Sequence, residues 1–160
     1  KICFVGFFSS SFRTLALKSH LLCRSATQVR QASSSGYEAA RGDSLGGDGI
    51  ILEPPHNTDS VVIWLHGLGD TAQGWYGAMG SLGLPDTTKF ILPTAATCPI
   101  SINAGMPMPG WTDIYGLDAN SPEDASGFED SRNRIDRIIE AELNAGVSPD
   151  RIAVCGFSQG

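Results

Sequence analysis

Residues 151–160 read Arg151-Ile-Ala-Val-Cys-Gly-Phe-Ser-Gln-Gly160 (RIAVCGFSQG) and join an apolar run to a Gly-x-Ser-x-Gly pattern. The run Ile152–Phe157 predicts a strand, and Ser158 stands where the chain must turn sharply out of it. Such a turn strains the serine backbone and brings Gly156 and Gly160 into close contact, where only very small side chains fit. The stretch therefore predicts a strand that presents a serine hydroxyl at the carboxyl edge of a sheet.

Three further strands are predicted upstream. The run SVVIWL at Ser60–Leu65 is apolar and β-branched nearly throughout, which is typical of a strand buried on both faces of a parallel sheet. Two shorter runs, GIILE at Gly49–Glu53 and KFIL at Lys89–Leu92, are each followed by proline. Because strands and helices alternate, we expect an α/β fold with a mostly parallel sheet and flanking helices.

Two helices are expected between the strands. Residues 71–82 predict a weak helix, since three glycines lower its stability. A stronger helix is predicted to begin at a capping box formed by Ser121 and Asp124 and to end at Gly146. Its apolar stripe comprises Phe128, Ile135, Ile138, Ile139 and Leu143. Residues 93–123 contain five prolines and no periodicity, so we expect a long ordered loop with a functional role.

The front of the chain differs in composition from the rest. Residues 1–41 hold six basic residues and one acidic one, whereas residues 42–160 hold five basic and sixteen acidic ones. We interpret 1–41 as a disordered leader, 42–48 as a linker and 49–160 as one domain. The acid-poor, serine-rich leader resembles a transit peptide; a secretory signal built on Ile2–Phe8 and an ill-defined leader are the alternatives.

Composition also excludes several classes of function. The acidic main body argues against a nucleic-acid partner, which would require a basic stripe. The four cysteines have no metal-type spacing, so we expect no metal site and interpret all four as reduced thiols. No stretch approaches the roughly 18 apolar residues that a membrane-spanning helix requires.

A second motif, WLHGLGD at Trp64–Asp70, follows the buried strand directly. A nucleophilic serine needs backbone amides directed at the oxyanion that develops during attack. We expect one amide from Gln159, the residue after the serine, and the other from Leu68 in this glycine-containing loop. His66 precedes the serine, whereas a catalytic base follows it in this type of site, so we expect His66 to be structural.

Several stretches in the same order resemble the acyl-protein thioesterase and lysophospholipase family of small α/β-hydrolases. They are WLHGLGDTAQGW, KFILPTAATCPISINAGMPMPGWTDIYGL, EDASG and RIAVCGFSQG, and the resemblance covers about residues 49–160. It implies a cofactor-free esterase or thioesterase with Ser158 as nucleophile and the amides of Leu68 and Gln159 as oxyanion hole. It also implies that Met108 and Trp111 lie beside an acyl-binding channel, with packing of the loop as the alternative role for Trp111.

The resemblance further implies the substrate and the location. The expected substrates are S-acylated, for example palmitoylated, proteins, and the product is released through an acyl-enzyme. The protein would be cytoplasmic and would meet membranes only through its acyl substrate, unless the leader directs it to a mitochondrion or plastid. Ala96, where the family has proline after Ala95, and Ala125 and Cys155 depart from the family pattern, but none of them is the inferred nucleophile.

The serine has no evident base in this stretch of chain. All three histidines, His20, His56 and His66, precede Ser158. A serine hydroxyl is a weak nucleophile until a base takes its proton. We therefore expect the acid and the base to follow Gly160 in the chain, and residues 1–160 alone to lack triad-level turnover.

Two other functions fit the same residues. One keeps the enzyme class and makes the substrate a lysophospholipid or a small carboxylic ester. The other is a non-catalytic short form that binds acyl chains without hydrolysing them. The coding sequence after residue 160 separates them, because an aspartate followed by a histidine would favour the enzyme.

Overall fold

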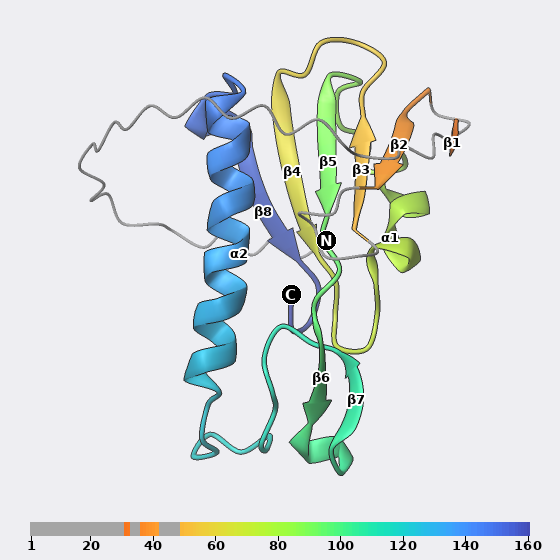
Figure 1. The fold of residues 1–160 in the computed structure, drawn as a ribbon. Coiled ribbons are helices and arrows are strands. Elements are labelled where there is room, and N and C mark those ends of the chain that lie inside the picture. Colours follow the sequence, from red (N-terminus) through yellow and green to blue (C-terminus); the bar gives the residue numbers. More distant parts are fainter. Residues whose placement is uncertain (1–30, 33–35, 42–48) are drawn as a thin grey trace, which may run out of the picture.

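The computed structural model describes residues 31–32, 36–41 and 49–160, and its centre is a six-stranded sheet (Figure 1). The strands lie in the order β1-β2-β3-β5-β4-β8. Their bounds are Gln31–Ala32 (β1), Glu38–Arg41 (β2), Ile50–Glu53 (β3), Ser60–Leu65 (β4), Thr88–Leu92 (β5) and Ile152–Gly156 (β8). Helices lie on both faces of the sheet, so the predicted α/β architecture is confirmed.

The parallel part of the sheet is formed by β5, β4 and β8. β4 pairs with β5 from Ser60↔Thr88 to Ile63↔Ile91 and with β8 from Val61↔Ile152 to Leu65↔Gly156. Because these strands run in the same direction, their carboxyl ends meet at one edge of the sheet. The loops that carry the two sequence motifs therefore leave the sheet side by side.

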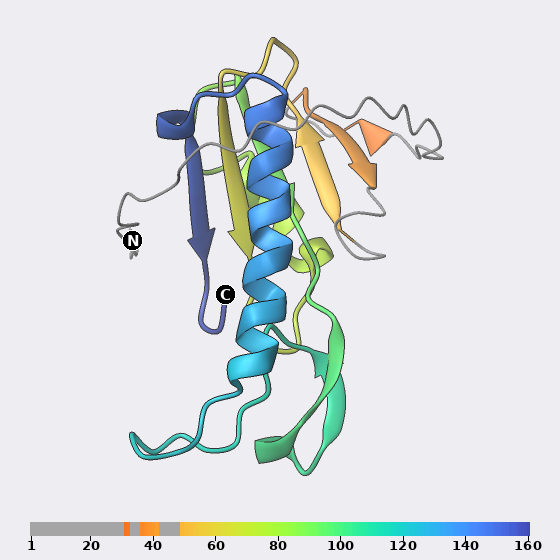
Figure 2. The ribbon, with the colours of Figure 1, turned by 60° about the vertical axis from the view of Figure 1, so that its left-hand side comes forward.

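Each face of the sheet packs against one helix, as the two views in Figures 1 and 2 show. α2 (Ala125–Asn144) covers the face that presents Val61 and Ile63, and α1 (Ala72–Met79) covers the face that presents Val62 and Trp64. The alternation follows from the two-residue period of a strand. Burial of both faces explains why the sequence of β4 is apolar throughout. Neither helix of the described residues is long and apolar enough to cross a membrane.

The start of the domain differs from the prediction. β2 pairs antiparallel with β3, from Glu38↔Glu53 to Arg41↔Ile50, and Tyr37 is buried, with its ring 5.7 Å from that of Phe90. Residues 38–41 therefore form a strand of the sheet and Tyr37 packs beside it, whereas the sequence pattern places these residues in the leader. The sequence of β2 alone does not reveal this pairing, because its partner β3 lies beyond the predicted linker, 42–48. That linker and residues 1–30 of the predicted leader lie outside the described residues.

The long helix also begins and packs differently from the prediction. Its N-cap is Asp124, whose carboxylate accepts from the Gly127 amide at 3.0 Å, and Ser121 lies outside the helix. Ile135 and Ile138 are buried as expected, but Phe128, at the predicted start of the apolar stripe, is 64% exposed. The predicted capping box is therefore wrong, and so are both ends of the stripe, because Leu143 is exposed as well.

A hairpin stands where a loop was expected. β6 (Thr97–Ile100) pairs antiparallel with β7 (Met106–Pro109), and a 3₁₀ turn, Ser101–Asn103, connects them. The hairpin extends below the carboxyl edge of the main sheet (Figure 1). Its prolines are tolerated because a two-stranded ribbon leaves half of its backbone amides facing outward. A second 3₁₀ turn, Pro149–Arg151, leads into β8.

One buried ion pair connects α2 to the sheet. Lys89 on β5 binds Glu142 at 2.8 Å and Glu53 at 3.3 Å, and the Lys89 and Glu142 side chains are mostly buried. Burial opposes the charge of Lys89, but the contacts with Glu142 and Glu53 outweigh it and raise the pKa of the ammonium group. Glu142 was not predicted in the core, because its partner is 53 residues away.

We predict that Glu142→Gln lowers the free energy of unfolding by about 1–3 kcal/mol, because Lys89 then stays buried with a weakened partner. The matched control is Glu53→Gln, whose side chain is 46% exposed and should matter by less than about 1 kcal/mol. Denaturant unfolding of the full protein measures both. Equal losses in the two variants would contradict a buried role for Glu142.

Candidate active site

The backbone of Ser158 adopts a left-handed conformation at the end of β8. Its φ is 57°, and among the described residues only Ala104 is another non-glycine with positive φ. Such a conformation costs on the order of 1–3 kcal/mol and persists only where the surroundings enforce it. The residue is exposed, so its hydroxyl is presented at the carboxyl edge of the sheet, near the end marked C in Figure 1.

Two glycines enforce this turn. A Cβ on Gly156 would overlap the backbone of Gly160, and a Cβ on Gly160 would overlap the carbonyl groups of Leu65 and His66. The turn is also closed by hydrogen bonds from the Phe157 amide to the Leu65 carbonyl and from the Gly160 amide to the Phe157 carbonyl, both 3.0 Å. The close contact predicted for these glycines is therefore present.

The loop after β4 lies directly beside the serine. A Cβ on Gly67 would stand 3.4 Å from Cβ of Ser158, so the backbone of Gly67 packs against the serine side chain. Gly69, with φ 78°, turns the loop and donates its amide to the Pro109 carbonyl at 2.8 Å. The amides of Leu68 and Gln159 make no hydrogen bond to any other residue within the described ranges.

The side chain of Gln159 connects the turn to the loop after the hairpin. Its Oε1 accepts from the Trp111 amide at 3.0 Å, and its Nε2 donates to the Thr112 carbonyl at 2.7 Å. Sequence reasoning assigned Gln159 only a backbone role. The only available signal was that a long amide side chain follows the serine, because the partner lies 48 residues away.

Trp111 is buried, with 6% of its surface exposed. Its Nε1 donates to the His66 carbonyl at 2.8 Å, and the Trp111 carbonyl accepts from the Ser131 hydroxyl. The guanidinium of Arg134 on α2 lies 5.7 Å from the ring centroid, within the range of a cation–π contact. These contacts favour packing, the alternative role considered for Trp111, over direct contact with an acyl chain.

Met108 remains accessible at the site. It is half-buried on β7, and its Sδ would stand 3.6 Å from a Cβ on Gly69. The structure thus brings Met108, the Leu68 loop and Ser158 to one edge of the sheet. The Leu68 side chain packs against Gly110, directly after β7, since its Cδ1 would stand 3.2 Å from a Cβ on that glycine.

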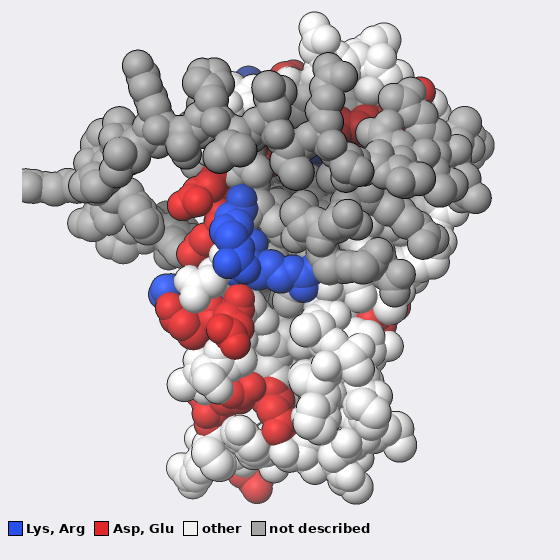
Figure 3. All heavy atoms as spheres, viewed as in Figure 1, with Lys and Arg blue, Asp and Glu red and all other residues white. Residues whose placement is uncertain are grey.

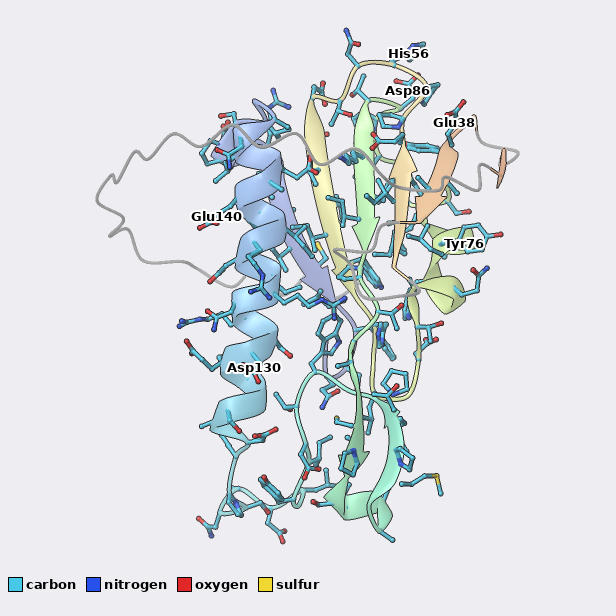
Figure 4. The ribbon with its side chains drawn as sticks, viewed as in Figure 1. Glu38, His56, Tyr76, Asp86, Asp130 and Glu140 are labelled. Carbon is cyan, nitrogen blue, oxygen red and sulfur yellow. The ribbon has the colours of Figure 1, made fainter. Side chains whose placement is uncertain are left out.

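Neither described histidine is placed as a base for the serine. His56 pairs with Asp86 at 3.4 Å at the opposite end of the sheet (Figure 4). Both ring nitrogens of His66 are occupied by backbone groups, Gly67 at 2.7 Å and Ala95 at 2.9 Å. His20 lies outside the described residues. The structural role predicted for His66 agrees with these two contacts.

A carboxylate network supports the loop on the other side of Trp111. Asp124 accepts from the Asp113 amide at 2.9 Å, and Asp113 accepts from the amide and hydroxyl of Ser101. The backbone amide of Asp113, then that of Gly127 and the Ser126 hydroxyl, lower the pKa of Asp124. The helix cap therefore also fixes the loop to the hairpin, which explains why Asp124 is the N-cap of α2.

The sequence profile of the phospholipase/carboxylesterase family matches residues 47–160. The chain belongs to this family. Its resemblance to the acyl-protein thioesterases, predicted from the motifs, is thereby confirmed, and the named relatives show that the family is enzymatic.

Three relatives show how much of the fold is present. Acyl-protein thioesterase 1 of Schizosaccharomyces pombe is 40% identical over 111 residues, which are 69% of this chain and 50% of that protein. Acyl-protein thioesterase 1 of Gibberella zeae is 44% identical over 119 residues, 69% of this chain and 51% of that protein. The crystal structure of Zea mays acyl-protein thioesterase 2 matches with a TM-score of 0.60 and 32% identity, over 71% of this chain and 47% of that one. The chain thus spans about half the length of these relatives.

The charges of this family member are mixed on the face drawn in Figure 3. On α2, Arg132 binds Glu129 at 2.7 Å and lies 3.9 Å from Asp136, at the spacings that helical neighbours require.

Within 31–32, 36–41 and 49–160, no three His, Cys, Asp or Glu side chains are grouped to hold a metal ion. The predictions that the protein uses no cofactor and binds no nucleic acid remain predictions.

We predict that Gly160→Ala displaces the turn, because its Cβ would overlap backbone atoms that cannot move aside. A displacement of about 1 Å at Ser158 should lower ester hydrolysis roughly 100-fold, and the overpacking should cost about 1–3 kcal/mol of stability. Hydrolysis and denaturant unfolding of the full protein measure the two effects.

The matched control is Gly77→Ala on α1, where a Cβ meets no atom within 4 Å. This variant should be stabilised by about 0.5–1 kcal/mol, because alanine is the better helix former, and should keep full activity. A Gly160→Ala protein that is as stable and as active as wild type would refute the close contact at the turn.

Proposed function

We propose that Ser158 is the nucleophile of a thioesterase that removes acyl groups from S-acylated proteins. The observation that carries this proposal is the left-handed backbone of Ser158, an exposed serine whose Cβ would stand 3.4 Å from a Cβ on Gly67. Membership of an enzymatic family and relatives named acyl-protein thioesterase support the reaction class.

The proposed reaction proceeds in two steps. Oγ of Ser158 loses its proton to a base and attacks the thioester carbonyl, and the carbon–sulfur bond breaks to release the cysteine thiol. Water then attacks the serine ester and releases the fatty acid. We propose that the base and the acid that orients it follow Gly160 in the chain, as the sequence motifs imply.

The amides of Leu68 and Gln159 are proposed to stabilise the oxyanion in both steps. Both are unoccupied within the described part of the chain, and both flank Ser158, one through Gly67 and the other as its neighbour. Unpaired, rigidly held amides are what an oxyanion hole requires, since they need no reorganisation when charge develops. Met108 and the hairpin would then flank the acyl chain, with Trp111 supporting the wall from behind.

The family is named for phospholipases and carboxylesterases, so lysophospholipids and small esters are the second candidate substrates. We further propose that the hydrolase domain begins by Tyr37, because that residue and β2 pack with the sheet. The protein would act in the cytoplasm and approach membranes through its acyl substrate. A leader, mitochondrial or plastid, would then be confined to the residues before Gln31, because β1 also pairs with the sheet.

We predict that Ser158→Ala lowers turnover of an S-palmitoylated peptide by on the order of 10⁴–10⁶-fold, because no acyl-enzyme can form. The matched control is Ser81→Ala, an exposed serine in the turn after α1, which should keep full activity. The same assay with a lysophospholipid separates the two substrate classes by their kcat/KM. Turnover that survives in Ser158→Ala would refute the proposed nucleophile.

A further inference from the structure

The His66 side chain is buried, with 1% of the residue's surface exposed, and each of its two ring nitrogens makes a hydrogen bond. Its Nδ1 lies 2.7 Å from the Gly67 carbonyl, and its Nε2 lies 2.9 Å from the Ala95 amide. A carbonyl oxygen only accepts and a backbone amide only donates. The imidazole must therefore be neutral, with its proton on Nδ1 and its lone pair on Nε2.

The bond to Gly67 also helps to fix the direction of the next amide, together with the Asp70 amide, which donates to the same carbonyl at 3.1 Å. The Gly67 carbonyl and the Leu68 N–H belong to one peptide group, which is planar and trans, as are all the described peptide bonds. In a trans peptide the carbonyl and the N–H point in opposite directions. Because His66 binds the carbonyl from the buried side, the Leu68 N–H must point away from the core.

We propose that His66 is a positioning residue that directs the Leu68 amide toward the oxyanion formed at Ser158. The inference rests on the proposed function and deepens it. The proposal gives His66, the first residue of the HGLGD motif, a role in orienting the Leu68 amide that a glycine without a side chain cannot have. Glycines make the loop able to turn. The imidazole and the Asp70 amide both bind the Gly67 carbonyl, and the imidazole is the shorter contact and binds it through a buried side chain.

The surroundings keep this imidazole in place and neutral. Trp111 packs against it with ring centroids 5.2 Å apart and binds its carbonyl, and Ala95 fixes the opposite ring nitrogen. Burial lowers the pKa of His66; Arg134 on α2 acts in the same direction, while Asp70 on the same loop and the bond to Gly67 act against it. An imidazolium would present a second N–H to the Ala95 amide and break this arrangement.

Two matched substitutions separate the two hydrogen bonds. The amide nitrogen of His66→Asn can take the position of Nδ1 and donate to Gly67, but the side chain is too short to reach Ala95. The amide oxygen of His66→Gln can take the position of Nε2 and accept from Ala95, but the donor to Gly67 is lost. Each variant thus loses one buried hydrogen bond, so their losses of stability should be similar.

We expect His66→Gln to lower kcat about 10–100-fold with little change in KM, which is part of the effect of removing one oxyanion donor. His66→Asn should keep kcat within about threefold of wild type, since the donor is retained. A trifluoromethyl ketone, which forms an oxyanion when the serine adds to it, should lose affinity for His66→Gln in the same proportion as kcat/KM. Wild type and Ser158→Ala are assayed in parallel in the full protein.

The outcomes are distinguishable. Absent turnover in wild type, or turnover that survives in Ser158→Ala, refutes the proposed function itself. If Ser158 is required but His66→Gln and His66→Asn lower kcat equally, or neither lowers it, the positioning role is refuted. Should both variants fail to fold, the side-chain ¹⁵N spectrum of wild type decides: an Nδ1–H tautomer at neutral pH supports the proposal, and an Nε2–H tautomer or an imidazolium overturns it.

Discussion

The contact between Gly160 and the carbonyl groups at the end of β4 is the constraint on which the site depends. It allows the chain to double back so closely that Ser158 takes a left-handed conformation. Any side chain at Gly156 or Gly160 would separate the two backbones. The strain at Ser158 is therefore maintained by backbone packing between two parallel strands, whose pairing from Val61 to Leu65 fixes their ends at the same level.

The rest of the described structure supports this contact from three directions. Beneath it, both faces of β4 are covered, by α1 on one side and α2 on the other. Beside it, Trp111 connects α2 to the loop after β4 through Ser131 and His66. From the hairpin, the Pro109 carbonyl binds the Gly69 amide, and the loop after the hairpin is bound to the serine turn through the Gln159 side chain. The site is thus a junction of four chain segments, each held by hydrogen bonds to the backbone of another.

Local patterns predicted the parts of the molecule whose causes are local. The apolar run of β4, the strand before Ser158 and the buried Ile135 and Ile138 of α2 follow from the periods of strand and helix. The requirement for Gly156 and Gly160 follows from the geometry of the turn alone. These features sufficed to predict the fold class and to single out Ser158.

The features that were missed depend on partners distant in the sequence. Tyr37 and β2 were assigned to a leader because nothing local shows that β3 pairs with them. The hairpin was hidden by its prolines, which interrupt the strand pattern but face outward in a two-stranded ribbon. Nothing local showed that Glu142 is buried, because Lys89, which neutralises it, is distant in the sequence on β5. The choice of Asp124 over Ser121 as helix cap depends on Asp113, which the same carboxylate binds.

A crystal structure of the full protein inactivated by a fluorophosphonate tests the central claim most directly, because the adduct places an oxygen where the oxyanion would form. We expect phosphorus bonded to Oγ of Ser158, a positive φ at this residue, and one phosphonyl oxygen about 2.7–3.1 Å from the amides of both Leu68 and Gln159. An adduct on another residue, a Ser158 with negative φ, or an oxygen that contacts neither amide would contradict the account.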